Sequence, residues 1–155
     1  MKTIGEWFDE YSDSHQNQTN KRIHWICVPT IYFSIIGILA HFSALLTAIL
    51  LALAFIFYAR LDLVLAVAMA ILTLVMAWLI MILPASLGLY IAIFIVAWIG
   101  QFYGHKIEGK KPSFFKDLQF LLVGPIWCMD AYLAKILPTW KSRQNSAIQP
   151  TLNAP

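Results

Sequence analysis

The sequence predicts an all-α integral membrane protein, a helical bundle recognisable from its composition and from the spacing of its apolar blocks. Hydrophobic residues make up 60% of the 155 residues and charged residues only 12%, which is far from the balance of a water-soluble domain. Four apolar blocks approach the roughly 20 helical residues needed to cross a hydrocarbon core. Residues 1–138 are predicted to form one membrane domain, and the polar residues 139–155 a disordered tail.

Residues 3–14 predict a short amphipathic helix ahead of the first apolar block. Thr3 and Glu6 have the spacing of a capping box. Apolar side chains recur at the offsets of one helical face: Ile4, Trp7, Phe8 and Tyr11. Such a helix either packs on the rest of the domain or lies in the lipid headgroup region, and both alternatives stay open.

His15 and His24 lie in the polar segment that follows. Nine positions on one continuous helix correspond to about 900° of rotation, which puts the two side chains on opposite faces. Asn17, Thr19 and Asn20, between them, favour turns and helix caps over helix interiors. We therefore predict a turn, a new helix capped near Thr19 or Asn20, and His15 folded back towards His24.

Four spanning helices are predicted, arranged as two helical hairpins. The spans cover about residues 25–39, 44–59, 63–83 and 87–102. Polar or helix-breaking residues separate them at 40–43, 60–62 and 84–86. The first two spans are rather short for a full crossing. The two hairpins are residues 25–59 and 63–102.

The number of crossings decides which histidines can meet. After four crossings the chain is back on its original side, so His105 shares a membrane face with His15 and His24, and His41 lies at the opposite face. Most basic residues fall on the histidine side: Lys2, Lys21, Arg22, Arg60, Lys106, Lys110, Lys111 and Lys116. The positive-inside rule makes that side cytoplasmic, at the inner membrane in a bacterium or the endoplasmic reticulum in a eukaryote. The net charge of +3, without a basic stripe, argues against nucleic-acid binding.

Residues 113–137 predict a broken, interfacial or re-entrant helical pair rather than a fifth span. Gly124 and Pro125 interrupt an apolar run, and a full crossing would carry Lys135 and later basic residues to the far side. A pair that returns to the cytoplasmic face keeps the basic residues together.

Three histidines on one membrane face predict a metal site. Imidazole nitrogens bind Fe, Zn, Cu and Ni, and oxygen-activating iron enzymes use such ligands with open positions. Histidines that bind a metal need polar partners that fix their tautomer. The candidates for this role or for a ligand are Asn17, Asn20, Gln101, Glu108 and Asp130. Alternatives stay open: each histidine could only hydrogen-bond water or backbone, Glu108 could pair with Lys106 or Lys111, and Asp130 could face the headgroups.

Taken together, the motif residues resemble a known membrane family. In order they are His15-x-Asn17-x-x-Asn20-x-x-Ile23-His24, Val28-Pro29-Thr30, Gln101-x-x-Gly104-His105 with Glu108 and Pro112, and Gly124-Pro125. Over about residues 5–137 this pattern resembles the membrane 2-hydroxy fatty acid dioxygenases of fatty acid α-oxidation, formerly a domain-of-unknown-function family. Gln18 stands where members often have proline.

The resemblance implies an Fe(II)-dependent reaction in which a 2-hydroxy fatty acid and O2 give the fatty acid one carbon shorter and CO2. It implies that His15, His24 and His105 hold the iron and are the catalytic residues. As a hypothesis, the iron keeps open positions for the substrate carboxylate, the 2-hydroxyl and O2, while membrane lipid surrounds the acyl chain.

Basic side chains near the histidines are candidates for guiding the substrate carboxylate. They are Lys21, Arg22, Lys106, Lys110 and Lys111. A role as topology signals is the alternative for all five. Two functions of other classes also stay open for the chain: another membrane metalloenzyme such as a zinc hydrolase, and a non-enzymatic lipid-binding or scaffold protein.

Overall fold

The computed structural model describes residues 2–83, 85–112 and 119–142, and this part of the chain is all-α, as predicted. The helices are α1 (Ile4–Ser12), α2 (Gln18–Phe42), α3 (Ala44–Leu61), α4 (Leu63–Ile82), α5 (Leu87–Glu108) and α6 (Phe120–Ile136). Helices α2 to α5 are each long and apolar enough to cross a membrane. Four such helices in one short chain are typical of an integral membrane protein.

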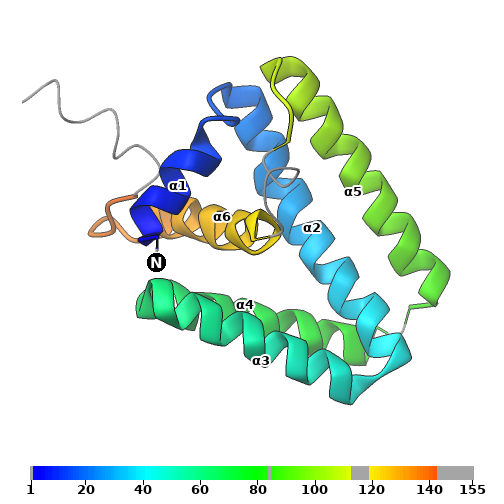
Figure 1. Cartoon of the computed structure of the whole chain (residues 1–155). Coiled ribbons are helices and arrows are strands. Elements are labelled where there is room, and N and C mark those ends of the chain that lie inside the picture. Colours follow the sequence, from blue (N-terminus) through cyan, green and yellow to red (C-terminus); the bar gives the residue numbers. More distant parts are fainter. Residues whose placement is uncertain (1, 84, 113–118, 143–155) are drawn as a thin grey trace, which may run out of the picture.

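The long helices form two pairs that diverge from a common end (Figure 1). Helix α2 packs along α5, and α3 packs along α4. Helix α6 lies between the two pairs and contacts both α2 and α4, while α1 packs on α6. The predicted hairpins are therefore partly wrong, because the main partner of α2 is α5 and α3 pairs with α4.

Glycines explain why α2 and α5 pack so closely. A Cβ atom built on Gly37 would lie 2.4 Å from the Tyr90 ring, and one on Gly100 would lie 2.7 Å from Cys27 Sγ. A Cβ atom on Gly104 would lie 2.4 Å from Asn20 Oδ1. Small residues let helix backbones approach one another in apolar surroundings. The α2–α5 contact therefore has no room for a larger residue at these three positions.

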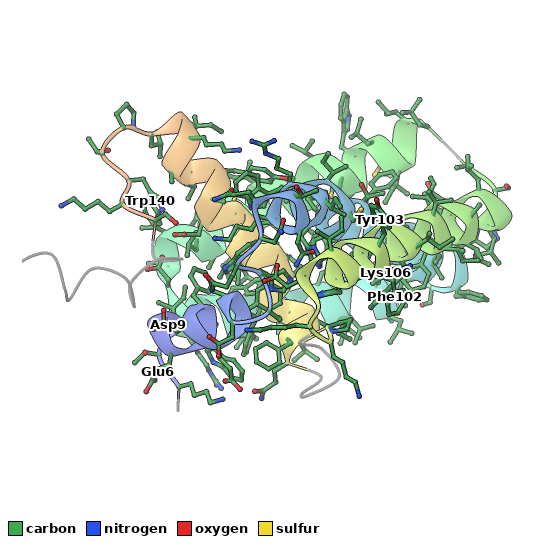
Figure 2. The ribbon with its side chains drawn as sticks, turned by 90° about the horizontal axis from the view of Figure 1, so that it is seen from above. Glu6, Asp9, Phe102, Tyr103, Lys106 and Trp140 are labelled. Carbon is green, nitrogen blue, oxygen red and sulfur yellow. The ribbon has the colours of Figure 1, made fainter. Side chains whose placement is uncertain are left out.

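The outward faces of the long helices are apolar. Leu74 and Met81 on α4 are 69% and 79% exposed. On α5, Phe102 and Tyr103 are also exposed, and Figure 2 labels both. Apolar surface of this extent is typical of contact with lipid rather than water.

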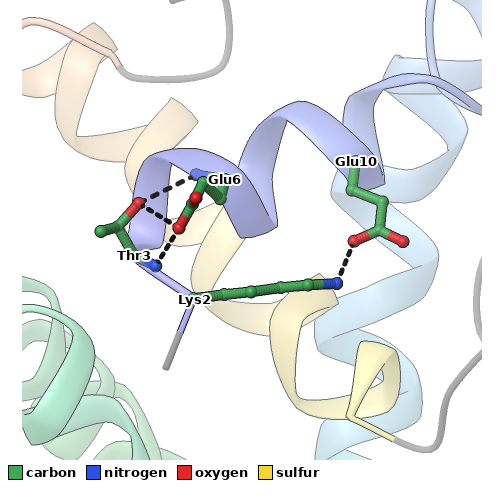
Figure 3. Close-up of polar contacts among 4 residues, drawn as sticks. All are labelled: Lys2, Thr3, Glu6 and Glu10. Atoms are coloured by element: carbon green, nitrogen blue, oxygen red, sulfur yellow. Dashed lines mark hydrogen bonds and ion pairs between the residues drawn. The ribbon is translucent and has the colours of Figure 1, made fainter.

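The capping box predicted at the start of α1 is present (Figure 3). Thr3 Oγ1 accepts a hydrogen bond from the Glu6 backbone N–H at 3.3 Å, and Glu6 Oε2 accepts one from the Thr3 backbone N–H at 2.6 Å. These bonds to Thr3 lower the pKa of Glu6. The apolar face of α1 is buried against α6, where Trp7 meets Phe120 edge-on at 5.4 Å. Of the two alternatives for this helix, packing on the domain is therefore correct.

Two helices are longer than predicted. Helix α2 begins at Gln18, because Asn17 caps it by accepting from the backbone N–H groups of Thr19 and Asn20 at 2.8 and 3.4 Å. The predicted cap at Thr19 or Asn20 is thus wrong by two or three positions. Helix α5 continues six residues past the predicted end and is closed by Gly109 at φ 73°. Its last turns are polar, so hydropathy alone ends the span too early.

The C-terminal helix differs from its prediction. Helix α6 runs unbroken through Gly124 and Pro125, so the predicted interruption is wrong. Buried packing against α1, α2 and α4 supports the helix despite the hydrogen bond that the proline removes. It is not among the helices long and apolar enough to cross a membrane. Residues 113–118, and residues 143–155 of the predicted tail, lie outside the described residues.

Candidate metal centre

Three buried histidines converge where the start of α2 meets the end of α5. His15 lies in the turn between α1 and α2, His24 in the second turn of α2, and His105 in the last turn of α5. One nitrogen of each ring lies within 4.8 Å of one nitrogen of each of the others. His24 Nε2 and His105 Nε2 are 3.1 Å apart, close to the separation of two nitrogens that each bind one ion at about 2.1 Å. His41 lies at the opposite end of α2.

Backbone carbonyl groups set the tautomers of two of these rings. His15 Nδ1 lies 2.7 Å from the Tyr11 carbonyl oxygen, and His24 Nδ1 lies 3.0 Å from the Asn20 carbonyl oxygen. A carbonyl oxygen only accepts, so each Nδ1 carries the proton and donates it. The lone pair of each ring is therefore on Nε2, and His24 Nε2 faces His105.

The surroundings of the three rings fit a bound cation. His15 Nε2 is buried and has no hydrogen-bond partner among the described residues. Burial, followed by the nearby His24, lowers the pKa of His15 to about 2, so this ring is neutral and keeps its lone pair at physiological pH. Three neutral imidazoles form a donor set that suits Fe, Zn, Cu or Ni.

Glu108 connects the end of α5 to the turn that carries His15. Its carboxylate accepts hydrogen bonds from the Gln16 and Asn17 backbone N–H groups at 2.9 and 2.8 Å, and from Asn20 Nδ2 at 3.1 Å. Asn20 Nδ2 also donates to the Ser14 carbonyl oxygen at 3.1 Å. Of the possible roles of Glu108, the structure therefore supports a partner that orders the histidine segment, and its bonds to the turn backbone were not predicted.

The other predicted polar residues fall in different places. Asn17 caps α2, and Asn20 is fully buried beside Gly104. Gln101 is buried on α5 and faces an apolar cavity. Asp130 is buried on α6 and accepts from Trp140 Nε1 at 3.0 Å and Ser142 Oγ at 2.6 Å, so it ties α6 to the segment after it.

This apolar cavity, of about 150 Å³, adjoins His24 and His105. Helices α2 and α5 line it at regular helical intervals, and α1 and α6 complete it. On α2 the lining runs from His24 to Ile35, and on α5 from His105 back to Phe94. Each series spans twelve residues, and the eleven steps from the first to the last correspond to about 16 Å at the rise of an α-helix. The cavity is therefore elongated, with two of the histidines at one end.

The five basic candidates lie elsewhere. None of Lys21, Arg22, Lys106, Lys110 and Lys111 is among the described residues that line the cavity. Lys21 lies beside Trp25 and Lys135, and Lys110 Nζ donates to the Asp13 carbonyl oxygen at 2.6 Å. Lys106 is exposed, beyond Phe102 and Tyr103 on α5 (Figure 2). The structure gives no contact through which they would hold a ligand inside the cavity.

Tyr11 was predicted only as part of the apolar face of α1. In the structure its ring stacks on His15, with centroids 4.3 Å apart and planes at 9°, and it also lines the cavity. Because His15 lies in the turn after α1, helical spacing does not predict this contact.

Comparison with known proteins identifies the family. A family model described as 2-hydroxy-palmitic acid dioxygenase Mpo1-like matches residues 1–136. No curated protein and no solved structure matches the chain. Because the family match covers most of the chain, the protein belongs to this family, which is the one that its motifs resemble.

Proposed function

We propose that this protein, as a member of that family, is an Fe(II)-dependent dioxygenase. It converts a 2-hydroxy fatty acid and O2 into the fatty acid one carbon shorter, CO2 and one water molecule. The observation that carries this proposal is the meeting of three buried histidines beside one end of an elongated apolar cavity. A fatty acid has matching parts, because its polar head suits the histidine end and its chain suits the apolar lining.

His15, His24 and His105 are the residues proposed to hold the ion. When bound, Fe(II) would activate O2 and would act as a Lewis acid towards the carboxylate and 2-hydroxyl of the substrate. The carbonyl groups of Tyr11 and Asn20 keep the Nδ1 protons of two rings in place. Glu108 holds the turn that carries the first of these histidines.

The cavity supports an acyl substrate that stays partly in the membrane. Its volume of about 150 Å³ is below the roughly 300–1,000 Å³ of pockets that enclose a whole ligand. Ile35, at the end remote from His105, is 38% exposed, so the cavity extends to the outer surface of the α2–α5 pair. The polar head and the first part of the acyl chain would lie inside the cavity, and the rest of the acyl chain would remain among the membrane lipids.

The proposal also includes the orientation in the membrane. Lys21 and Arg22 lie in the first turns of α2, and Lys106, Lys110 and Lys111 lie at or just beyond the end of α5. These ends adjoin the histidines, whereas the turn at Ser43 at the far end has no basic residue beside it other than His41. The positive-inside rule therefore supports a cytoplasmic histidine end.

A turnover assay with defined metal content tests the proposed function. Protein purified without added metal is analysed for bound metal, stripped with a chelator, and reloaded with Fe(II) or Zn(II). With 2-hydroxypalmitate, only the Fe(II) form should consume O2, in equal amount to the shortened acid that it releases. Product formation without O2, or equal turnover with Zn(II), would rule out the dioxygenase and favour the hydrolase alternative.

Histidine variants test which residues bind the metal. His24→Ala should lower bound metal and O2 uptake at least tenfold, because ligand loss costs more than the roughly 10–100-fold loss seen for residues behind the ligands. His41→Ala, at the opposite end of the same helix, is the matched control and should behave as wild type. Both variants should insert into membranes normally. A fully active His24→Ala protein would favour the scaffold or lipid-binding alternative.

A further inference from the structure

Tyr11 and Gln101 bring polar groups to the largely apolar cavity beside the histidines. Tyr11 reaches it from α1 and is 5% exposed, and Gln101 reaches it from α5 and is 6% exposed. Most of the remaining lining is aliphatic or aromatic, for example Val28, Ile31 and Phe94. A phenol and a primary amide therefore stand at the same end of the cavity as His24 and His105.

Neither side chain has a hydrogen-bond partner in the part of the chain that the structure describes. The Tyr11 hydroxyl and the Gln101 side-chain amide make no hydrogen bond among the described residues. Neither group is among the completely buried polar atoms that lack a partner, so both are accessible from the cavity. Tyr32, which lines the same cavity, differs because its hydroxyl hydrogen-bonds Thr73 Oγ1 at 2.8 Å. Buried polar groups without partners cost free energy unless a ligand or water supplies the bond.

The packing around both side chains directs them to the head end of the cavity. Stacking on His15 fixes the Tyr11 ring, and its hydroxyl ends beside Gly124 of α6, where a Cβ atom would lie only 3.0 Å away. Gln101 lies one helical turn before His105, on the same face of α5. The two groups thus approach the histidine end of the cavity from different helices.

We propose that Tyr11 and Gln101 bind the polar head of the substrate and make the cavity select 2-hydroxy acids over unsubstituted fatty acids. The inference rests on the proposed function and deepens it. The phenol donates to a carboxylate oxygen, and the Gln101 side-chain carbonyl accepts from the 2-hydroxyl. A site built to pair with a ligand hydroxyl discriminates strongly against the analogue without it, because its own polar group is then left unpaired.

Binding without turnover tests this inference. Detergent-solubilised protein loaded with Zn(II), which binds imidazole but does not activate O2, is titrated with 2-hydroxypalmitate and with palmitate by isothermal calorimetry. Tyr11→Phe and Gln101→Leu should each weaken 2-hydroxypalmitate binding about tenfold, the value of one hydrogen bond. Palmitate binding should change less than about twofold in Gln101→Leu, so that the preference for the hydroxy acid falls.

Tyr32→Phe is the matched control. It also removes a hydroxyl from the lining of this cavity, but that hydroxyl already has a hydrogen-bond partner in Thr73. It should change the affinity for neither acid by more than about twofold, and bound zinc should be equal in all variants. Equal weakening of both acids by Gln101→Leu would indicate a structural role and overturn the inference. Wild-type protein that binds neither acid would overturn both this inference and the proposed function. A wild-type preference for the hydroxy acid that persists in Gln101→Leu would overturn this inference alone.

Discussion

The two helix pairs have helices of similar length but differ in what joins them. Helices α2 and α5 meet through glycines and buried polar groups, among them Asn20, His24 and His105. Helices α3 and α4 contribute mainly apolar side chains such as Leu65 and Met69 to the core, and their other faces are exposed. The contact between α2 and α5 depends on particular side chains that fit against glycines. The contact between α3 and α4 depends on apolar surface, which many side chains can provide. Substitutions at the close contact between α2 and α5 near the histidines should therefore change metal binding, and those between α3 and α4 should change only stability.

Among substitutions that leave the three histidines in place, Gly104→Ala at the contact between α2 and α5 should have the largest effect on metal binding. Alanine favours a helix by up to about 1 kcal/mol, but its Cβ would lie 2.4 Å from Asn20 Oδ1. Asn20 is fully buried and held by Ser14 and Glu108, so it cannot move aside without displacing the histidine segment. We expect metal affinity to fall about 100-fold, measured by competition with a chelator.

Gly88→Ala is the control on the same helix. A Cβ atom there would meet only Ser86 Oγ, at 3.9 Å, so metal affinity should stay at the wild-type value. A Gly104→Ala protein that binds metal as tightly as Gly88→Ala would show that the contact between α2 and α5 is more tolerant than its geometry indicates.

Glu108→Gln should have an intermediate effect. The amide keeps one acceptor oxygen but replaces the other with a donor, which faces N–H groups of the turn at Gln16 and Asn17. We expect metal affinity to fall about tenfold while the spanning helices stay intact, as measured by metal content and circular dichroism.

Glu10→Gln is the matched control for this change. Glu10 forms an exposed ion pair with Lys2 at 2.6 Å (Figure 3), and such pairs contribute about 0–1 kcal/mol. It should leave metal binding unchanged. Equal losses in the two variants would mean that negative charge near the site matters more than the hydrogen bonds of Glu108.

The smallest effect on metal binding is expected in the α3–α4 pair. Met69→Ala removes a side chain that is 1% exposed and should lower the unfolding free energy by about 2–5 kcal/mol. Leu74→Ala, at 69% exposure, should lower it by less than about 0.5 kcal/mol. Thermal unfolding in detergent measures both, and chelator competition should show no change in metal affinity. A large loss of metal in Met69→Ala would show that the two pairs are coupled.

The shared face of the three histidines could be predicted, because it depends on crossing parity rather than on side-chain packing. An even number of crossings returns the chain to its starting side, which puts His105 on the same face as His15 and His24. The contact between α2 and α5 then brings the rings together. The capping box at Thr3 and Glu6 was also predictable, since it involves only neighbours in the chain. Interactions between chain neighbours and the number of membrane crossings thus account for these two predictions.

The parts that were wrong depend on tertiary contacts. Gly124 and Pro125 are helix breakers by propensity, yet burial against three other helices keeps α6 continuous. The pairing of α2 with α5 follows from three glycines that match residues across the contact, and one sequence does not show such a match. The carboxylate of Glu108 binds backbone N–H groups far away in the chain, which no side-chain pattern reveals.

The separation of the histidines along the chain has a consequence for biosynthesis. His24 and His105 are 81 residues apart, and a growing chain emerges from the ribosome with its N-terminus first. While α2 enters the membrane, the helix that carries His105 has not yet been made. The three histidines are therefore together only after the fourth long helix has been made, so an ion that needs all three ligands would bind after that point.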